Sequence, residues 1–196
     1  MKQLELTKPA RGFLKHLAFA FAMASGLIAG TALAAPANDN FANAINLPGN
    51  TGTQTGTDNI DATVEGGEPS MAGAGAFNTV WFQWTSPADG NFTVSTLGST
   101  NATPAEFDAV LGIYSGVALN SLTPLPGTPQ DIVLEESMTV AVTAGTSYYI
   151  QVGGYNNEAA ANILLNWSFA ATIYQADILT FGPGALVGPA LSLARC

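Results

Sequence analysis

The sequence has very few basic residues: 5 Lys and Arg stand against 14 Asp and Glu in 196 residues, with one His and one Cys. Four of the five bases and the only His lie in the first 16 residues: Lys2, Lys8, Arg11, Lys15 and His16. Beyond that segment, catalysis by a His base, a Lys Schiff base or a phosphate loop ending in Lys has no residues to use. Since Cys196 is the only cysteine, no intramolecular disulfide can form.

Residues 1–34 have the pattern of an export signal. The positive charges precede an apolar run from residue 17 to 33, and Ala32-Leu33-Ala34 supplies a small-x-small cleavage site. The run approaches the ~20 residues that span a bilayer, so an uncleaved anchor is the alternative. The small residues at its end favour cleavage after Ala34. We therefore predict a secreted protein, extracellular or periplasmic, with no membrane insertion after cleavage.

Cleavage would make the charge imbalance extreme. The remaining chain would keep Arg195 as its single base against thirteen carboxylates, a net charge of −12. Such a surface repels phosphate backbones and anionic lipid headgroups, which excludes nucleic acids and anionic membranes as partners. It suits solubility or the binding of cations.

Residues 78–87 form the most strand-like stretch. Val80, Phe82 and Trp84 fall on one face, and the alternation resumes at 91–97 after the turn residues Asp89-Gly90. This pattern predicts two antiparallel strands joined by a short turn. Because Trp81 and Trp84 share one strand, a second layer is needed to bury them.

The rest of the chain continues in short apolar segments. We expect strands at 41–47, 59–65, 107–114, 131–135 and 163–169, a weak one at 119–125, and a polar edge strand or loop at 50–57. The clearest hairpin signal is Ala144-Gly145 between 138–143 and 146–152. Gly112 indicates a bulge or a close backbone approach. The fold class is all-β: a two-sheet antiparallel β-sandwich of jelly-roll or Greek-key type with eight to ten strands.

The expected domain organisation has three parts. Residues 1–34 are the signal, 35–172 one β-sandwich domain, and 173–196 a C-terminal tail. The tail is apolar and broken by Gly and Pro, which is typical of the start of a further module cut short. A sorting segment is the alternative, with Arg195 as its only basic residue.

Four blocks, in this order, resemble the bacterial pre-peptidase C-terminal (PPC-like) domain family. They are NDNFANA at 38–44, TVWFQWTSPADG at 79–90, FDAVLGIYSG at 107–116 and VTAGTSYYIQVGGY at 142–155. The resemblance covers about residues 38–169. It implies a jelly-roll-like, non-catalytic accessory domain of secreted bacterial enzymes and surface proteins, some of which bind calcium, collagen-like proteins or polysaccharides. No peptidase accompanies it in this sequence, so the domain either works alone or belongs to a longer design.

Calcium is the metal that the composition favours, because hard cations bind several carboxylate, amide and carbonyl oxygens. Asp39 stands between two Asn, and Asp58, Asp61, Glu65 and Glu68 share one polar region. No spacing matches an EF-hand loop, and simple surface acidity is the alternative. The candidate calcium ligands are Asp39, Asp58 and Asp61.

Aromatic side chains are candidates for a sugar-binding platform: Trp81, Tyr114, Tyr149, Tyr155 and Trp167. A place in the core is the alternative for each, and it is the expectation for Trp84 and Trp167. Tyr155 is followed by Asn156 and Asn157 in a predicted loop, and loops at sandwich ends commonly carry binding sites. These three residues are the candidate ligand-binding site.

The function predicted from these observations is a secreted non-catalytic binding module, calcium-stabilised or not, for a polysaccharide or an extracellular protein. The alternative is a structural or adhesin-type subunit that self-associates through an exposed strand edge. A third hypothesis is a glycoside hydrolase with a carboxylate pair, Glu106 with Asp108 or Glu135 with Glu136. Solvated carboxylates of loops and strand edges are the expected interpretation of those pairs.

Overall fold

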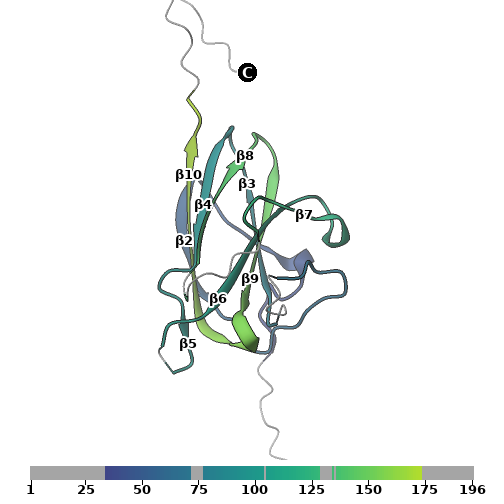
Figure 1. The fold of residues 1–196 in the computed structure, drawn as a ribbon, viewed down its shortest axis with the longest axis vertical. Coiled ribbons are helices and arrows are strands. Elements are labelled where there is room, and N and C mark those ends of the chain that lie inside the picture. Colours follow the sequence, from purple (N-terminus) through teal and green to yellow (C-terminus); the bar gives the residue numbers. More distant parts are fainter. Residues whose placement is uncertain (1–33, 72–76, 104, 129–133, 135, 174–196) are drawn as a thin grey trace, which may run out of the picture. The chain divides into compact units, whose positions relative to one another are not determined.

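The computed structural model describes residues 34–71, 77–103, 105–128, 134 and 136–173. All of them belong to one unit, Leu33–Cys196, and they form two stacked β-sheets (Figure 1). The predicted all-β two-sheet sandwich is confirmed. The predicted signal apart from Ala34, nearly all of the expected strand at 131–135, and the tail from 174 to Cys196 lie outside the described residues.

The first sheet has the order β1-β3-β9-β6-β7: β1 (Ile45–Asn46), β3 (Val80–Thr85), β9 (Ser147–Gly154), β6 (Ala109–Ser115) and β7 (Thr123–Pro124). The second has the order β2-β10-β4-β8: β2 (Thr51–Thr57), β10 (Ala160–Ala171), β4 (Gly90–Ser95) and β8 (Ser137–Val142), with β5 (Thr100–Asn101) also paired to β10. Only β1 and β3 pair in parallel among the described strands. Three 3-10 helices connect them: η1 (Phe41–Asn43), η2 (Leu119–Ser121) and η3 (Tyr155–Asn157).

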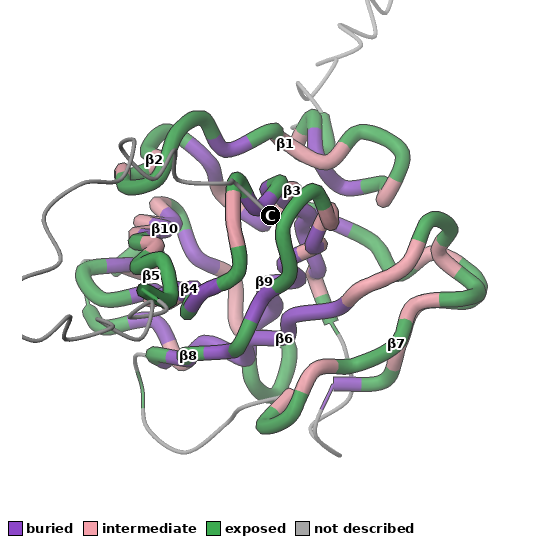
Figure 2. Tube along the Cα trace, turned by 90° about the horizontal axis from the view of Figure 1, so that it is seen from above, coloured by how far each residue is buried: buried purple, intermediate pink, exposed green. Residues whose placement is uncertain are grey.

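The core lies between the sheets and is built by strict alternation along the strands. Val80, Phe82 and Trp84 of β3 are fully buried there, as predicted. The Trp84 ring stacks on Phe92 of the opposite sheet, with centroids 4.0 Å apart and planes 6° apart. Its indole N–H donates to the Gly49 carbonyl at 2.8 Å, so burial of Trp84 leaves its polar group paired. Figure 2 shows buried stretches on strands of both sheets, among them β6 and β9 of the first and β4 of the second.

Both predicted hairpins are wrong in their pairing. β3 pairs with β9 and β1, whereas β4 pairs with β10 and β8; β8 and β9 likewise lie in different sheets. The turns after β3 and after β8 therefore carry the chain across the sandwich. They hold each other at that end, because Gly145 N–H donates to Ser86 O at 2.8 Å and Ala144 N–H to the Asp89 carboxylate at 2.9 Å. Turn chemistry reverses the chain direction; burial of both apolar faces decides which strand becomes the neighbour.

Three other predicted elements differ in the structure. The expected strand at 41–47 is η1 followed by the two-residue β1, and 119–125 is η2 followed by β7. Residues 59–65 form a loop, because backbone groups in this segment bond to side chains, as when Asp39 accepts from Thr63 N–H at 2.6 Å.

The close approach predicted at Gly112 is made by a side chain: a Cβ there would lie 2.6 Å from the Tyr114 hydroxyl oxygen. The polar strand at 50–57 exists as β2, at the edge of the second sheet.

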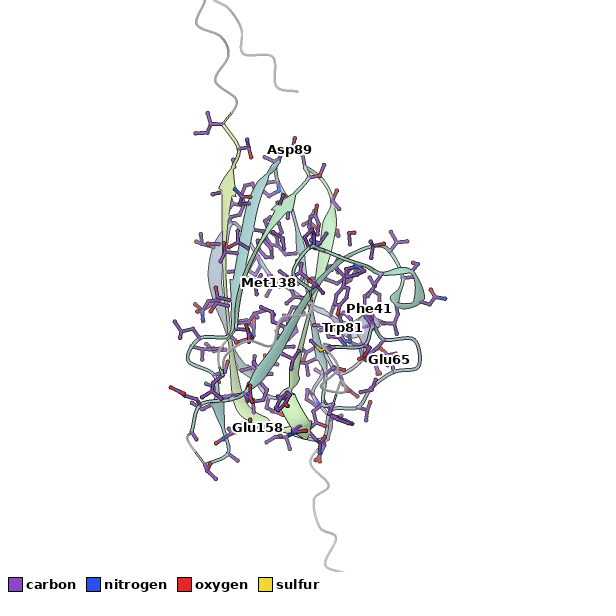
Figure 3. The ribbon with its side chains drawn as sticks, viewed as in Figure 1. Phe41, Glu65, Trp81, Asp89, Met138 and Glu158 are labelled. Carbon is purple, nitrogen blue, oxygen red and sulfur yellow. The ribbon has the colours of Figure 1, made fainter. Side chains whose placement is uncertain are left out.

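The outer face of the first sheet, away from the core, is also covered. Trp81, Val110 and Tyr114 point to this side, and all three are buried. Phe41 of η1 packs on Trp81 edge to face, with centroids 5.2 Å apart, and the loop that follows β2 reaches the same face through Glu68. Figure 3 shows Phe41, Trp81 and Glu65 together on this side of the molecule. The first sheet is thus enclosed on both faces.

Candidate functional site

The predicted ligand-binding residues lie at one end of the sandwich, where β9 turns into β10. Tyr155 and the two asparagines form η3, and all three are exposed. Asn156 and Asn157 both have positive φ angles, 52° and 67°, a conformation that asparagine tolerates better than most residues. The prediction that Tyr155 is exposed in a loop is confirmed, and 38% of its surface is accessible.

Glu158 fixes the position of this turn. Its carboxylate accepts from the Asn101 side-chain amide at 2.9 Å and from Asp108 N–H at 3.1 Å, while its own N–H donates to Tyr155 O at 2.9 Å. Tyr155 N–H donates to Asp108 O at 2.9 Å. The loops before β6 and after β9 are therefore joined, and Glu158 lies at the end of the molecule opposite Asp89 (Figure 3).

A third loop, the one after β2, reaches the same end through Asn59. The fully buried Asn59 accepts from Ala160 N–H at 2.6 Å and donates its amide to Asn78 O at 2.8 Å. Gly154 N–H donates to Phe77 O at 3.4 Å. A Cβ at Gly154 would overlap the Glu158 carbonyl, so glycine is required where these loops meet.

Two residues with partly exposed aromatic side chains lie next to these bonds in the chain. The carbonyl of Phe77 accepts a hydrogen bond from the N–H of Gly154, and Tyr155 is the next residue along the chain. The Phe77 side chain is 44% accessible and that of Tyr155 is 38% accessible. Sequence reasoning missed Phe77, because it precedes the strand pattern and nothing in its neighbours indicates exposure. The loop end thus offers aromatic rings beside amides and carboxylates, a set that suits stacking and hydrogen bonding. We refer to Phe77, Tyr155, Asn156 and Asn157 as the loop-end site.

The candidate calcium ligands have hydrogen-bonding roles of their own. The carboxylate of Asp39 is mostly buried and accepts from Thr63 twice, from its N–H at 2.6 Å and from its hydroxyl at 3.0 Å. Asp58 accepts from Ile60 N–H at 3.0 Å within its own loop. Asp61 is exposed and has a φ of 58°.

These three carboxylates do not form a recognisable coordination set. In the part of the chain that the structure describes, no group of three or more Asp, Glu, His or Cys side chains is placed to hold a metal ion. Calcium binding by Asp39, Asp58 and Asp61 therefore stays a prediction from composition.

The most elaborate polar arrangement surrounds Glu68 on the outer face of the first sheet. Its carboxylate accepts from the Thr79 hydroxyl at 2.6 Å and, from β9 and β3, from the Gln151 amide at 2.9 Å and the Trp81 indole N–H at 3.3 Å. Glu65 N–H is a fourth donor at 3.0 Å. Burial raises the pKa of Glu68 above its ordinary value of 4.5, and the hydrogen bonds oppose this shift. The arrangement fastens a loop to a sheet.

Trp81 and Tyr114 are not available as a sugar platform, because both are buried beneath this loop. Trp167 is buried in the core, as expected, and only Tyr149 is half-exposed, with its ring centroid 4.4 Å from that of Phe41. Burial, and then the nearby charge of Glu68, raise the pKa of Tyr114, so its phenol stays neutral. Of the five aromatic candidates, Tyr155 is the one that fits a binding surface.

Of the two carboxylate pairs considered for glycoside hydrolysis, the second has Glu135 outside the described residues and Glu136 fully buried. The two members of the first pair have different surroundings. Glu106 is exposed and bridges to Thr100 through its backbone. Asp108 is half-buried. Its N–H donates to the Glu158 carboxylate, and its carbonyl accepts from the N–H of Tyr155. No helix among the described residues is long and apolar enough to span a membrane.

No family model and no curated protein matches the chain. Two similar solved structures are PliG, a periplasmic inhibitor of g-type lysozyme from Aeromonas hydrophila, and the Yersinia pseudotuberculosis-derived mitogen YPM. PliG is 14% identical to this chain, with a TM-score of 0.36, and the match covers 65% of this chain and 96% of PliG. YPM is 19% identical, with a TM-score of 0.38, and the match covers 68% of this chain and 97% of YPM. Both TM-scores are below 0.5, and no function follows from either likeness.

Proposed function

We propose that this protein is a secreted, non-catalytic binding module that holds a neutral polysaccharide at the loop-end site. The observation that carries the proposal is the exposure of two aromatic residues at this end: Tyr155, which follows Gly154, and Phe77, whose carbonyl accepts the Gly154 N–H. Aromatic ring faces pack against the apolar faces of sugars, and the neighbouring amides of Asn156 and Asn157 can donate to and accept from hydroxyl groups.

Rigid anchoring supports a binding role for this end. Asn59 and Glu158 tie three loops together, so the aromatic side chains are held in place before any ligand arrives. Preorganisation of this kind lowers the entropy cost of binding. The resemblance to the pre-peptidase C-terminal family, with its accessory domains of secreted proteins, supports the same proposal.

The negative charge of this chain limits the kinds of polysaccharide that it can bind. The full chain has a net charge of −9, and its expected secreted form −12. Sulfated or uronic-acid polysaccharides would be repelled, whereas neutral polymers such as glucans or chitin would not. An extracellular protein with a basic or neutral surface is the second candidate, because aromatic residues are also enriched at protein interfaces.

The proposal is tested by retention of the purified chain on columns of insoluble neutral glucan, chitin and immobilised collagen. Tyr155→Ala and Phe77→Ala should each weaken retention on the binding polysaccharide by about tenfold, equivalent to ~1.4 kcal/mol. Val117→Ala, a change at an exposed residue beyond the opposite end of β6, is the matched control. Retention that none of these changes alters, or that occurs on collagen alone, contradicts a polysaccharide site here.

A further inference from the structure

Three polar side chains on the outer face of the first sheet meet at one atom. The Oε2 atom of Glu68 accepts from the Thr79 hydroxyl at 2.6 Å and from the Gln151 side-chain amide at 2.9 Å. Since both bonds end on the same oxygen, Thr79 Oγ and Gln151 Nε2 are at most 5.5 Å apart. The Thr63 carbonyl is a second acceptor for the Thr79 hydroxyl, at the longer distance of 3.1 Å. A hydroxyl, a primary amide and a carboxylate therefore share one small space.

The pairing of β3 with β9 makes Thr79 and Gln151 diagonal neighbours. Thr79 directly precedes β3, and the pairing of Val80 with Val152 sets it opposite Gly153, which is two positions from Gln151 on the same face. Diagonal neighbours of this kind are within reach of long side chains. Gly153 has no side chain to separate them, and a Cβ there would lie 3.3 Å from the Thr79 methyl carbon. Contact between the hydroxyl and the amide carbon then needs side-chain rotation and no movement of the strands.

Two buried polar atoms of this face have no hydrogen-bond partner among the described residues: Gln151 Oε1 and the Tyr114 hydroxyl. Both residues are almost completely inaccessible to solvent. Gly112 of β6 is directly opposite Gln151, and the Tyr114 hydroxyl oxygen lies over Gly112, 2.6 Å from the place of a Cβ. A phenol donor and an amide acceptor, each costly to leave unpaired, therefore lie over neighbouring positions of the sheet. The role of Glu68 in fastening the loop leaves both atoms unexplained.

We propose that Thr79 and Gln151 react with each other to form an ester crosslink between the start of β3 and β9. The Thr79 oxygen bonds to the side-chain carbonyl carbon of Gln151, and the bond from that carbon to Nε2 breaks. The hydroxyl proton leaves with the nitrogen, so a hydroxyl and a primary amide give an ester and one molecule of ammonia. No atom changes its oxidation state, and the step therefore needs no cofactor.

Glu68 has the position of a proton shuttle for this step. Its Oε2 atom takes the proton from the Thr79 hydroxyl during the attack and passes it to the Gln151 nitrogen, to which the same oxygen is already bonded. Burial raises the pKa of Glu68, which makes its carboxylate a stronger base. The Tyr114 hydroxyl is the donor for the negative charge that develops on Gln151 Oε1. The reaction thus gives each of the two unpaired atoms a partner.

Burial favours the crosslink over hydrolysis. Thr79 and Gln151 are both fully buried, so water, the competing nucleophile, is kept from the amide and afterwards from the ester. Ammonia escapes into the solvent, where it is protonated and diluted, and this drives the step forward. The product is a covalent link within a chain whose only cysteine, Cys196, can form no intramolecular disulfide. The proposal is independent of the loop-end site, because it concerns different residues on another face.

Mass spectrometry of the refolded full chain tests the reaction. We expect the wild type, kept at neutral pH until its mass is constant, to be lighter than its sequence by about 17 Da, the mass of one ammonia. After unfolding and cleavage at Asp and Glu residues, the peptide with Thr79 should stay joined to the peptide with Gln151. Hydroxylamine, which cleaves esters, should separate them. A linked peptide distinguishes the crosslink from ammonia loss at an asparagine. A chain of full mass, or Gln151 converted to Glu with no linked peptide, overturns the proposal.

Threonine variants test which hydroxyl attacks. Thr79→Ser keeps a hydroxyl and should still lose ammonia, whereas Thr79→Val, which has nearly the same shape, should not. Thr85→Val is the matched control, because it removes an exposed hydroxyl at the other end of β3 and should leave the mass loss unchanged. Circular dichroism shows whether each variant is folded. Ammonia loss in Thr79→Val, or none in folded Thr79→Ser, contradicts Thr79 as the nucleophile.

The rate of ammonia loss after refolding tests the other two groups. Glu68→Gln should slow it about a hundredfold or more, because a positioned proton-transfer group contributes at least that factor. Tyr114→Phe should also slow it by about a hundredfold, the effect of removing one donor to a developing oxyanion. Folded variants that react as fast as the wild type would overturn the roles assigned to Glu68 and Tyr114.

Discussion

Glu68 accepts a hydrogen bond of 2.9 Å from Gln151, a residue 83 positions further along the chain. The bond joins the long loop after β2 to the outer face of β9. Since Trp81 and Thr79 donate to the same carboxylate, one side chain fixes the loop over the sheet. This contact explains why Trp81 and Tyr114 are buried although they point away from the core.

Replacing Glu68 should destabilise the fold without changing its architecture. Glu68→Gln replaces one carboxylate oxygen with an N–H₂ group, so the N–H donors of Gln151, Trp81 and Glu65 have one acceptor oxygen in place of two. We expect a loss of about 1–3 kcal/mol, measured by urea unfolding. Glu106→Gln, at an exposed position, should stay within about 0.5 kcal/mol. Equal losses would mean that the Glu68 carboxylate does not hold the loop.

The same residue predicts a pH dependence. Because its pKa is raised in the folded state, folding favours the protonated form relative to the unfolded chain. The resulting contribution to stability is present below the ordinary pKa of 4.5 and is lost as pH rises through the raised value. The stability of the wild type relative to Glu68→Gln should therefore fall between about pH 3 and pH 8. A difference that grows with pH would show that the four donors outweigh the cost of burial.

Gly154 should tolerate no side chain. Its φ is ordinary, −102°, so the obstacle to Gly154→Ala is steric: the new Cβ would overlap the Glu158 carbonyl. We expect overpacking to cost about 1–3 kcal/mol, seen as a lower thermal midpoint. Gly66→Ala, where nothing lies within 4 Å of a Cβ, is the control. A neutral Gly154→Ala would mean that the loop end is less tightly joined than these contacts indicate.

Calcium binding by Asp39, Asp58 and Asp61, which the composition predicts, can be tested by stability. If these residues bind calcium, the thermal midpoint should be higher in millimolar Ca²⁺ than in EDTA, and equal midpoints would contradict the prediction. A real site filled at a hundredfold excess over Kd would add about 2.7 kcal/mol and be plainly visible. A rise abolished by Asp58→Asn or Asp61→Asn would establish these residues as ligands.

Local pattern predicted the strand faces well. Alternation identified Val80, Phe82 and Trp84 as the inward face of β3, and a loop of Asn and Tyr identified the exposed turn at Tyr155. Both depend on near neighbours in sequence. Phe77 could not be found in this way, because its exposure and its position beside Tyr155 depend on a bond to Gly154, 77 residues away.

Strand pairing was the point at which local pattern failed. Asp89-Gly90 and Ala144-Gly145 were recognised as turns, and turns they are, but each joins strands of opposite sheets. A turn constrains only the direction of the chain. Whether the next strand pairs with its predecessor or crosses the sandwich depends on the burial that the whole set of strands achieves.

The sequence by itself determined the all-β class, the placement of the strands that alternate, and the acidic, His-poor character that argues against most catalytic chemistry, because these follow from residue type and periodicity of two. The tertiary structure alone decided which strands are neighbours, that a loop anchored by Glu68 covers the outer face of the first sheet, and that the Phe77 carbonyl meets Gly154, the residue before Tyr155. Each of these depends on contacts between residues far apart in the chain, which no local pattern encodes.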